Sequence, residues 1–438
     1  MKKRLLTAAL AVILTLSLAA CGNGDNDSVN LPTPGNSGNT SSLSTDFQKN
    51  MSQTDAFEIP YLCETEDGYY FQHDTFIYFI DKQTKAATIL CAKPDCLHDD
   101  NTCNAFINSL SLSYSNNKLY FMNGDRVLEN GKYNDYGWRL YSIDVDGTNR
   151  SDSQSLEFTP GGDTSPYKTT PIIHRGNVYF TYKGVVYSVP LGEEIDNATA
   201  IWGEESGGSN SAVMVVDPNA LQCTLWADGD YMYFMANIKQ SNGTYKDTLF
   251  AYHTEEKELK QVWQTPDASE VGEWEETGVS VSQWYVTDGY IYFYLSGNDM
   301  WRTSLETGKH EKLAQTSDKT QYGTAVFSDQ YMCLMNTAPG NFVDLFGGGA
   351  VHTGGNTIYV YGLDGAFVKE ISLNDLYKNN SDIELCQPVF CSGNDLYFLV
   401  DATTWNDPIN GVSSPNTNLV LCCVDIGTGD ITQVYGWN

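Results

Sequence analysis

The chain has 438 residues, with 25 basic against 55 acidic side chains and a formal net charge of −30 at pH 7. This charge excludes nucleic-acid binding as a function, because phosphate recognition needs clustered Lys and Arg. Aromatic residues form 13% of the chain and charged residues only 18%, a composition that favours β-strands.

Residues 1–20 have the layout of a secretory signal peptide. Lys2, Lys3 and Arg4 precede an apolar stretch, Leu5 to Ala20, that contains no charged side chain. This stretch is shorter than the roughly 20 residues that a membrane-spanning helix needs. The pattern therefore predicts export of the protein rather than a membrane span.

The sequence Leu-Ala-Ala-Cys at 18–21 resembles the lipobox of bacterial lipoproteins. The resemblance implies that Cys21 becomes the first residue of the mature protein and carries acyl chains, palmitate among them. Such chains would anchor the protein at the extracytoplasmic face of the cell membrane. Residues 21–54 are rich in Gly, Ser and Asn, so we expect a disordered tether there and a folded domain over residues 55–438.

A short motif recurs seven times in this domain. It consists of turn-forming residues followed by an apolar and aromatic strand, as in NNKLYF at 116–121 and DGYIYF at 288–293. The seven copies are anchored on Tyr70, Tyr120, Tyr179, Tyr233, Tyr292, Cys333 and Tyr397. Their spacing varies from 41 to 64 residues, which is too uneven for a solenoid with a fixed rise.

Each copy lies within a unit of four predicted strands. In the clearest unit, residues 280–315, the first two strands are joined by a turn at 287–289 and the last two by a turn at 306–308. Units of this kind predict an all-β fold, a seven-bladed β-propeller of four-stranded antiparallel blades. Six or eight blades is the alternative count, and two β-sandwiches or a β-helix fit the pattern less well.

The repeats resemble the propellers of TolB and of the low-density-lipoprotein-receptor type. Together with the lipobox and the Cys-x-Lys-Pro-x-Cys-x-His segment at 91–98, they resemble more closely the uncharacterised propeller lipoproteins of anaerobic Gram-positive bacteria. The resemblance covers the whole chain. It implies the propeller fold and the lipid anchor but assigns no activity.

Loop lengths predict a binding surface. In a propeller, the second-to-third strand loops and the connections between blades lie on one face, which we call the long-loop face. The insertions in this chain fall in that set, at residues 91–110, 124–137, 151–170, 203–219, 265–280, 338–356 and 402–417. Long loops on one face of a rigid scaffold are where binding is usually placed.

Aromatic residues are the candidate ligand contacts on this face. They are Tyr133, Tyr136, Trp138, Tyr167, Trp274, Phe342 and Trp405. Rings beside carboxylates suit recognition of a glycan, a peptide or a protein, although each ring could instead cover its own blade. We therefore expect a monomeric binding or scaffolding module.

Enzyme motifs are absent from the sequence. There is no His-Glu-x-x-His, Gly-x-Ser-x-Gly or Walker motif, so no catalytic residue is assigned. Five of the six histidines fall in five different predicted blades: His73, His174, His253, His310 and His352. Residues 144–152 have partly calcium-like spacing but coincide with a turn that every blade uses, which favours a plain turn. The alternative function is a propeller hydrolase or lyase acting on a surface polysaccharide or peptide with loop carboxylates.

The segment from Cys91 to Cys103 concentrates four candidate metal ligands. Cys91, Cys96, His98 and Cys103 have the number and chemistry of a structural zinc site. A disulfide between two of the three thiols, leaving the third free, and three unlinked thiols are the other possibilities. We expect the segment to follow the outer strand of blade 1 and run inward along the long-loop face, with Cys63 too distant to join it. A bonded cluster would pin this connection rather than catalyse a reaction.

Overall fold

A computed structural model describes residues 62–73, 75–107, 112–129, 132–155, 171–182, 185–203, 213–215, 225–240, 245–267, 281–295, 299–315, 324–344, 350–374, 376, 385–401, 404–405, 415–416 and 419–436. All of them belong to one unit, Leu43–Asn438. The secondary structure in these ranges is almost wholly β-strand, with a 3₁₀ turn η1 (Ile195–Asn197). Within them, no helix has the length and apolarity needed to cross a membrane.

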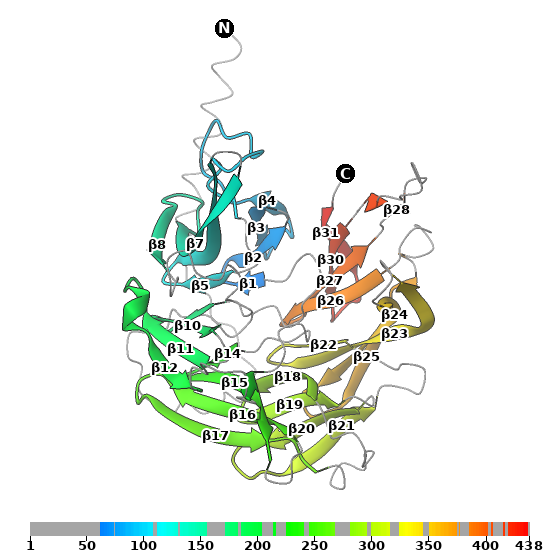
Figure 1. Cartoon of the computed structure of the whole chain (residues 1–438). Helices are drawn as coiled ribbons and strands as arrows, with labels where there is room; N and C mark the ends of the chain where they lie inside the picture. The colour runs from blue at the N-terminus through cyan, green and yellow to red at the C-terminus, as the bar shows by residue number, and fades with distance from the viewer. Residues whose placement is uncertain are drawn as a thin grey trace, which may run out of the picture. The chain divides into compact units, whose positions relative to one another are not determined.

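Seven antiparallel sheets follow one another around a ring, each with four blade strands in chain order, and the sheet of blade 4 has a fifth, short strand (Figure 1). The protein is therefore a seven-bladed β-propeller, as the repeats predict. Blade 1 consists of β1 (Leu62–Glu64), β2 (Gly68–His73), β3 (Phe76–Asp81) and β4 (Ala87–Ile89); blade 2 of β5 (Ser113–Ser115), β6 (Lys118–Glu129), β7 (Lys132–Asp144) and β8 (Ser151–Ser155); and blade 3 of β9 (Ile172–His174), β10 (Asn177–Tyr182), β11 (Val185–Pro190) and β12 (Thr199–Trp202). Blade 4 consists of β14 (Leu225–Asp228), β15 (Tyr231–Lys239), β16 (Tyr245–His253) and β17 (Glu258–Gln264), and blade 5 of β18 (Val281–Thr287), β19 (Tyr290–Leu295), β20 (Asp299–Ser304) and β21 (His310–Gln315). Blade 6 consists of β22 (Thr324–Phe327), β23 (Tyr331–Asp344), β24 (Ala350–Gly362) and β25 (Phe367–Ser372), and blade 7 of β26 (Leu385–Ser392), β27 (Asp395–Asp401), β30 (Leu419–Asp425) and β31 (Ile431–Gly436).

The recurring motif marks the second strand of every blade. Its seven anchor residues are each the third residue of β2, β6, β10, β15, β19, β23 or β27, and none is more than 9% exposed. The turn before the strand has the backbone that the motif predicts. Asn116 and Asn117 have φ of +48° and +62°, and such positive angles in a two-residue hairpin turn favour Asn and Gly.

The core lies between neighbouring blades. The second strand is buried on both faces, as all six residues of β2 are, whereas in the outer strand β17 only Trp263 is buried. One apolar cluster joins blades 1 and 2, another joins blades 2 and 3, and a third joins blades 6 and 7. A continuous cluster extends from blade 3 to blade 6. Each blade is therefore stabilised mainly by its two neighbours.

The ring closes by packing of blade 1 against blade 7. Each of these blades takes its four strands from one end of the domain, so no strand is exchanged between them. Leu62, Tyr69 and Phe71 of blade 1 share an apolar cluster with Phe390 and Tyr397 of blade 7. Residues 46–54, a possible additional strand, lie outside the described residues.

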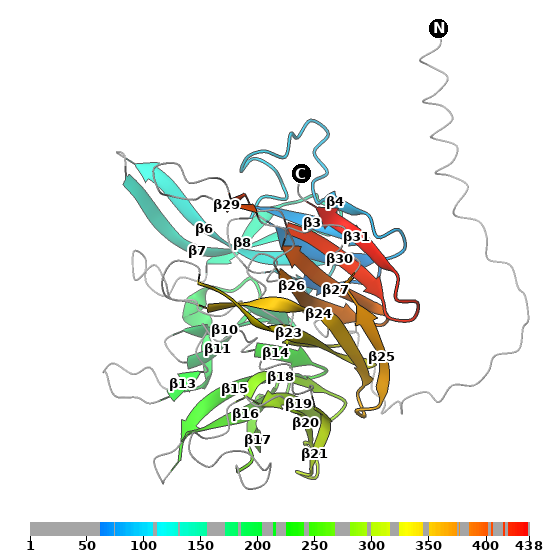
Figure 2. The same cartoon turned by 90° about the vertical axis from the view of Figure 1, so that its right-hand side faces the viewer.

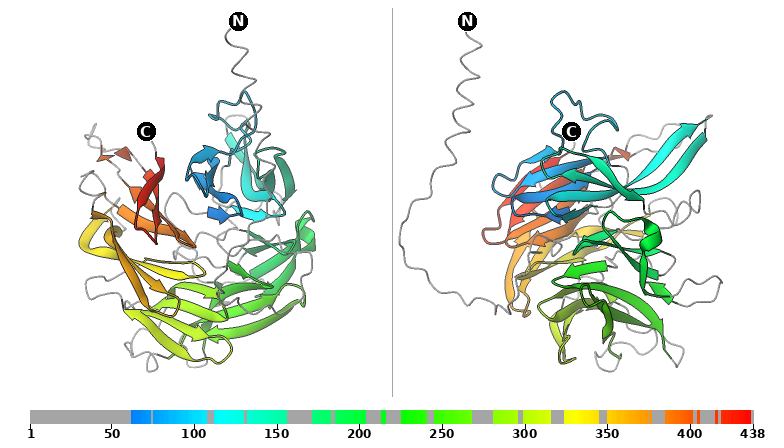
Figure 3. Two further views of the ribbon diagram at one scale, coloured as in Figure 1. Left: turned by 180° about the vertical axis from the view of Figure 1, so that it is seen from behind. Right: turned by 90° about the vertical axis from the view of Figure 1, so that its left-hand side faces the viewer.

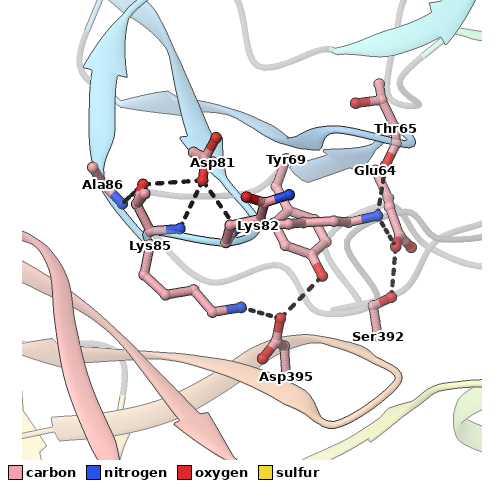
Figure 4. Close-up of polar contacts among 11 residues, drawn as sticks. Glu64, Thr65, Tyr69, Asp81, Lys82, Lys85, Ala86, Ser392 and Asp395 are labelled. Atoms are coloured by element: carbon pink, nitrogen blue, oxygen red, sulfur yellow. Dashed lines mark hydrogen bonds and ion pairs between the residues drawn. The ribbon is translucent and has the colours of Figure 1, made fainter. Parts of the chain in front are cut away.

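Polar contacts reinforce this closure on the face opposite the long-loop face, where the turns between first and second strands and between third and fourth strands lie (Figure 4). Glu64 of blade 1 accepts a hydrogen bond from Ser392 Oγ of blade 7 at 2.7 Å and pairs with Lys82 at 2.7 Å. Asp395 of blade 7 pairs with Lys85 and accepts a hydrogen bond from the Tyr69 hydroxyl at 3.4 Å. Both carboxylates therefore have partners in blade 1.

Lys85→Met is expected to lower the free energy of unfolding by about 1–2 kcal/mol, because it leaves the partly buried Asp395 without its cation. Urea unfolding measures the effect. Lys260→Met is the matched control, since the ion pair of Lys260 with Glu258 is exposed and lies within one strand, and it should leave the unfolding midpoint unchanged. Equal effects of the two substitutions would show that the Lys85 contact does not contribute to closure.

Two of the predicted insertions are strand extensions rather than loops. Residues 124–129 belong to β6 and residues 132–137 to β7, and much of 338–356 belongs to β23 and β24. Residues 151–155, expected to begin a loop, form the outer strand β8. Two other insertions also contain strands: β13 (Val213–Val215) pairs with β15, and β28 (Thr404–Trp405) pairs with β29 (Pro415–Asn416). The β6–β7 hairpin projects well beyond the neighbouring blades (Figures 2 and 3).

Candidate metal centre

The four predicted ligands lie on the segment that connects β4 to β5. This segment, pale blue in the figures, loops outward at the rim of the ring beside blades 1 and 2 (Figures 1 and 2). Its ends are held by the main chain of blade 1. Leu90 N–H donates to Ile77 O at 2.9 Å, Ile77 N–H donates to Ala105 O at 2.9 Å, and Ile107 N–H donates to Thr75 O at 2.8 Å.

The segment brings the four ligands together. The ligand atoms of Cys91, Cys96, His98 and Cys103 all lie within 4.8 Å of one another, and His98 Nδ1 lies 3.4 Å from Cys103 Sγ. In a tetrahedral zinc site with Zn–S bonds of about 2.3 Å, sulfurs are separated by about 3.8 Å. A small contraction of the group would therefore complete the coordination geometry of a metal ion.

Local turns aim these side chains inward. Cys96 N–H donates to Lys93 O at 3.3 Å, which closes a turn around Pro94. His98 has φ of +57°, a left-handed backbone that a non-glycine residue rarely adopts. Between the last two ligands, Asp100 accepts hydrogen bonds from Thr102 N–H at 2.8 Å and Thr102 Oγ1 at 2.6 Å. The chain from Cys96 to Cys103 is thus folded back on itself.

The environments of the first and last ligands differ. Burial would raise the pKa of the Cys91 thiol, but hydrogen bonds from the backbone N–H groups of Lys93 and Asn104 outweigh it and hold the pKa below its usual value. Cys103 is 1% exposed, and burial raises its pKa to about 12. Because the thiolate is the form that binds metal, ligation of an ion would require all three thiols to lose their protons.

No disulfide joins these thiols. Cys91, Cys96 and Cys103 are free, as are the other cysteines whose side chains the structure describes. Cys63 lies outside the group, as predicted, and its thiol donates to Leu112 O at 3.1 Å. Elsewhere, the sulfurs of Cys333 and Cys391 are 3.9 Å apart between blades 6 and 7. The arrangement at the rim is therefore one of four separate ligands that could bind a metal.

The path of the segment differs from the prediction. It does not run only along the long-loop face, because Ala92 N–H donates at 3.3 Å to Gly147 O, in the turn between the third and fourth strands of blade 2. In a propeller, the turns between third and fourth strands lie on the face opposite the long-loop face. The strong twist of the blades brings this turn against the outside of blade 1, a contact that strand order alone does not show.

The turn at residues 144–152 is a plain turn, as predicted. Asp146 accepts hydrogen bonds from Thr148 N–H at 2.9 Å and Thr148 Oγ1 at 2.7 Å, and Asp144 pairs with Lys118. Both carboxylates are thus occupied within the turn and its neighbouring strand. The histidines also conform to expectation: His73, His174, His253, His310 and His352 lie in blades 1, 3, 4, 5 and 6.

For five of the seven candidate aromatic contacts, the structure describes the strand that carries the residue but not its side chain. Tyr133, Tyr136 and Trp138 lie in β7, Phe342 in β23 and Trp405 in β28, with their side chains outside the described part. Tyr167, Trp274 and the predicted lipidation site Cys21 also lie outside the described residues. Their roles stay predictions.

Known proteins resemble this chain only distantly. No family model and no curated protein matches the chain. Similar solved structures include the computationally designed Ika8 protein (11% identity, TM-score 0.35, covering 81% of this chain and 96% of that one) and BamB from Moraxella catarrhalis (10%, 0.36, 77% and 92%). Oligopeptidase B from Leishmania major is also similar (8%, 0.46, 90% and 49%), and the chain spans about half its length. At these identities the likeness carries no inference about function.

Proposed function

We propose that this protein is a lipid-anchored, extracytoplasmic propeller that binds a glycan, peptide or protein partner through its long-loop face. The observation that carries the proposal is the uneven length of the connections. The second-to-third strand hairpins of blades 2 and 6 are built from strands of 12 and 13 residues and of 14 and 13 residues. The turns between first and second strands, such as Asn116–Asn117 and Asp288–Gly289, have only two residues.

This asymmetry favours a binding role for physical reasons. The second strands of the other blades have six to nine residues, so strands of 12 to 14 residues extend past the length from which the rest of the ring is built. Rigid scaffolds place recognition on such extensions. The signal peptide and lipobox pattern at residues 1–21 supports the membrane anchor and the extracytoplasmic location.

We propose further that the rim cluster binds one Zn²⁺ with a structural role. Three thiolates and an imidazole suit zinc, and four protein ligands leave no open position for substrate or water. Cys91, Cys96, His98 and Cys103 would hold the ion, which would fix the connection between the first two blades.

A glycan and peptide array with the purified protein tests the binding proposal. Trp138→Ala and Trp405→Ala are expected to weaken binding of an array hit at least tenfold, while the free energy of unfolding changes by less than about 1 kcal/mol. Phe367→Ala is the control, since Phe367 is exposed on the outer strand β25. Unchanged affinity in both tryptophan variants would move the ligand site to another surface.

A further inference from the structure

The ligand segment contacts two blades, not one. Blade 1 holds it through the main-chain bonds of Thr75 and Ile77 and through the ring contact of Phe76 with Phe106, whose centroids are 6.1 Å apart. Blade 2 holds it through the turn and the first residues after the turn, at Gly147 and Arg150. The contacts from blade 2 converge on the first and the last metal ligand.

Arg150 binds the chain immediately after the last ligand. Its Nη1 donates to the carbonyl oxygens of Cys103 at 3.2 Å, Asn104 at 3.1 Å and Phe106. Its guanidinium lies beside the stacked rings of Phe121 and Tyr141, 5.3 Å from each centroid. The side chain is thus fixed by two strands of blade 2, and three carbonyls of the ligand segment are fixed by it.

Gly147 joins the two ends of the ligand set. Its carbonyl oxygen accepts hydrogen bonds from Ala92 N–H at 3.3 Å and Asn104 Nδ2 at 2.9 Å. These donors are neighbours of Cys91 and Cys103. A Cβ at position 147 would lie 3.0 Å from Cys91 N, and Gly147 has φ of +81°, so only glycine fits without strain.

We infer that the metal site is completed by blade 2, and that Arg150 is a positioning residue that couples metal binding to the docking of blade 2 on blade 1. This inference rests on the proposed zinc site. Three thiolates around Zn²⁺ carry a net charge of −1, and the Arg150 cation lies beside the carbonyl of Cys103. Residues that hold ligands in place lower the ordering cost of binding, so metal affinity depends on them although they touch no metal. The coupling is reciprocal: bound metal favours the docked state of the two blades.

Zinc affinity of variants tests the inference. Arg150→Ala is expected to weaken Zn²⁺ binding about 10–100-fold, measured by competition with a chromophoric chelator, because substitution of such supporting residues has this effect. Arg150→Lys keeps the charge but loses the three-carbonyl contact, so its affinity should lie between those of Arg150→Ala and the wild type.

Arg302→Ala is the matched control. Arg302 donates to Leu363 O at 3.0 Å, in the equivalent turn of the next blade, and lies 4.7 Å from the Tyr290 ring, but it is remote from the cluster. Its Zn²⁺ affinity should stay within twofold of the wild type. If the Arg150 variants bind Zn²⁺ as tightly as Arg302→Ala does, the inference about Arg150 is wrong, whereas the proposed zinc site still stands. If Arg150→Ala does not fold, Arg150→Lys decides in the same way. A wild-type protein that binds no zinc would instead overturn the proposed zinc site, on which the inference rests.

Discussion

Cys96→Ser is expected to abolish the stability that zinc gives the protein. With free zinc about 1,000-fold above its dissociation constant, binding to the native state alone contributes about 4 kcal/mol to the free energy of unfolding. Cys96 is one of four ligands and only partly buried, so its loss removes the metal with little damage to the core. Urea unfolding with zinc and with a chelator measures the difference for each variant.

Cys63→Ser is the control for this experiment. Cys63 is 3% exposed in the same inter-blade core but is not a ligand. It should lower stability by the same amount with and without zinc, and so preserve the zinc-dependent difference. A zinc-dependent difference that survives in Cys96→Ser would contradict the four-ligand assignment.

Phe390→Ala is expected to lower the free energy of unfolding by about 3–5 kcal/mol, the cost of an aromatic deletion in a closed core. Phe390 is fully buried where blade 7 meets blade 1, and its ring contacts Tyr69 with centroids 5.5 Å apart. Since closure depends on packing rather than on strand exchange, we expect the whole domain to unfold earlier and in one transition.

Phe367→Ala gives the comparison for thermal and urea unfolding. Phe367 is 59% exposed, so its deletion should change stability by less than about 0.5 kcal/mol. Two separate transitions in the Phe390→Ala protein would show that the ring consists of independently folding parts.

The blades could be predicted from the sequence because their signals are local. Alternating apolar residues and short turns with Asn, Asp or Gly recur in each unit, so the third residue of every second strand, from Tyr70 to Tyr397, was placed correctly. The extended hairpins could not be recognised in this way. Residues 124–137 are polar and contain glycines that resemble loop signals, yet cross-strand pairs such as Leu128 with Tyr133 continue the ladder.

The candidate metal site, like the fold, could be predicted from the sequence only in part. The spacing of Cys91, Cys96, His98 and Cys103 predicted that these side chains would lie together as a candidate ligand set, because all four lie on one short segment. Gly147 and Arg150 could not be found, since they follow in the next blade and reach the ligands only through the packing of two twisted sheets. A glycine and an arginine at the end of a turn carry no signal of such a contact.

Metal analysis with thiol titration tests the central claim most directly. The protein, purified anaerobically, is assayed for metal by mass spectrometry and for reactive thiols with and without a chelator. We predict one zinc per chain, with the partly exposed Cys91 and Cys96 protected from the thiol reagent until the chelator removes the metal. A protein without metal, in which these two thiols react freely from the start, would contradict the account.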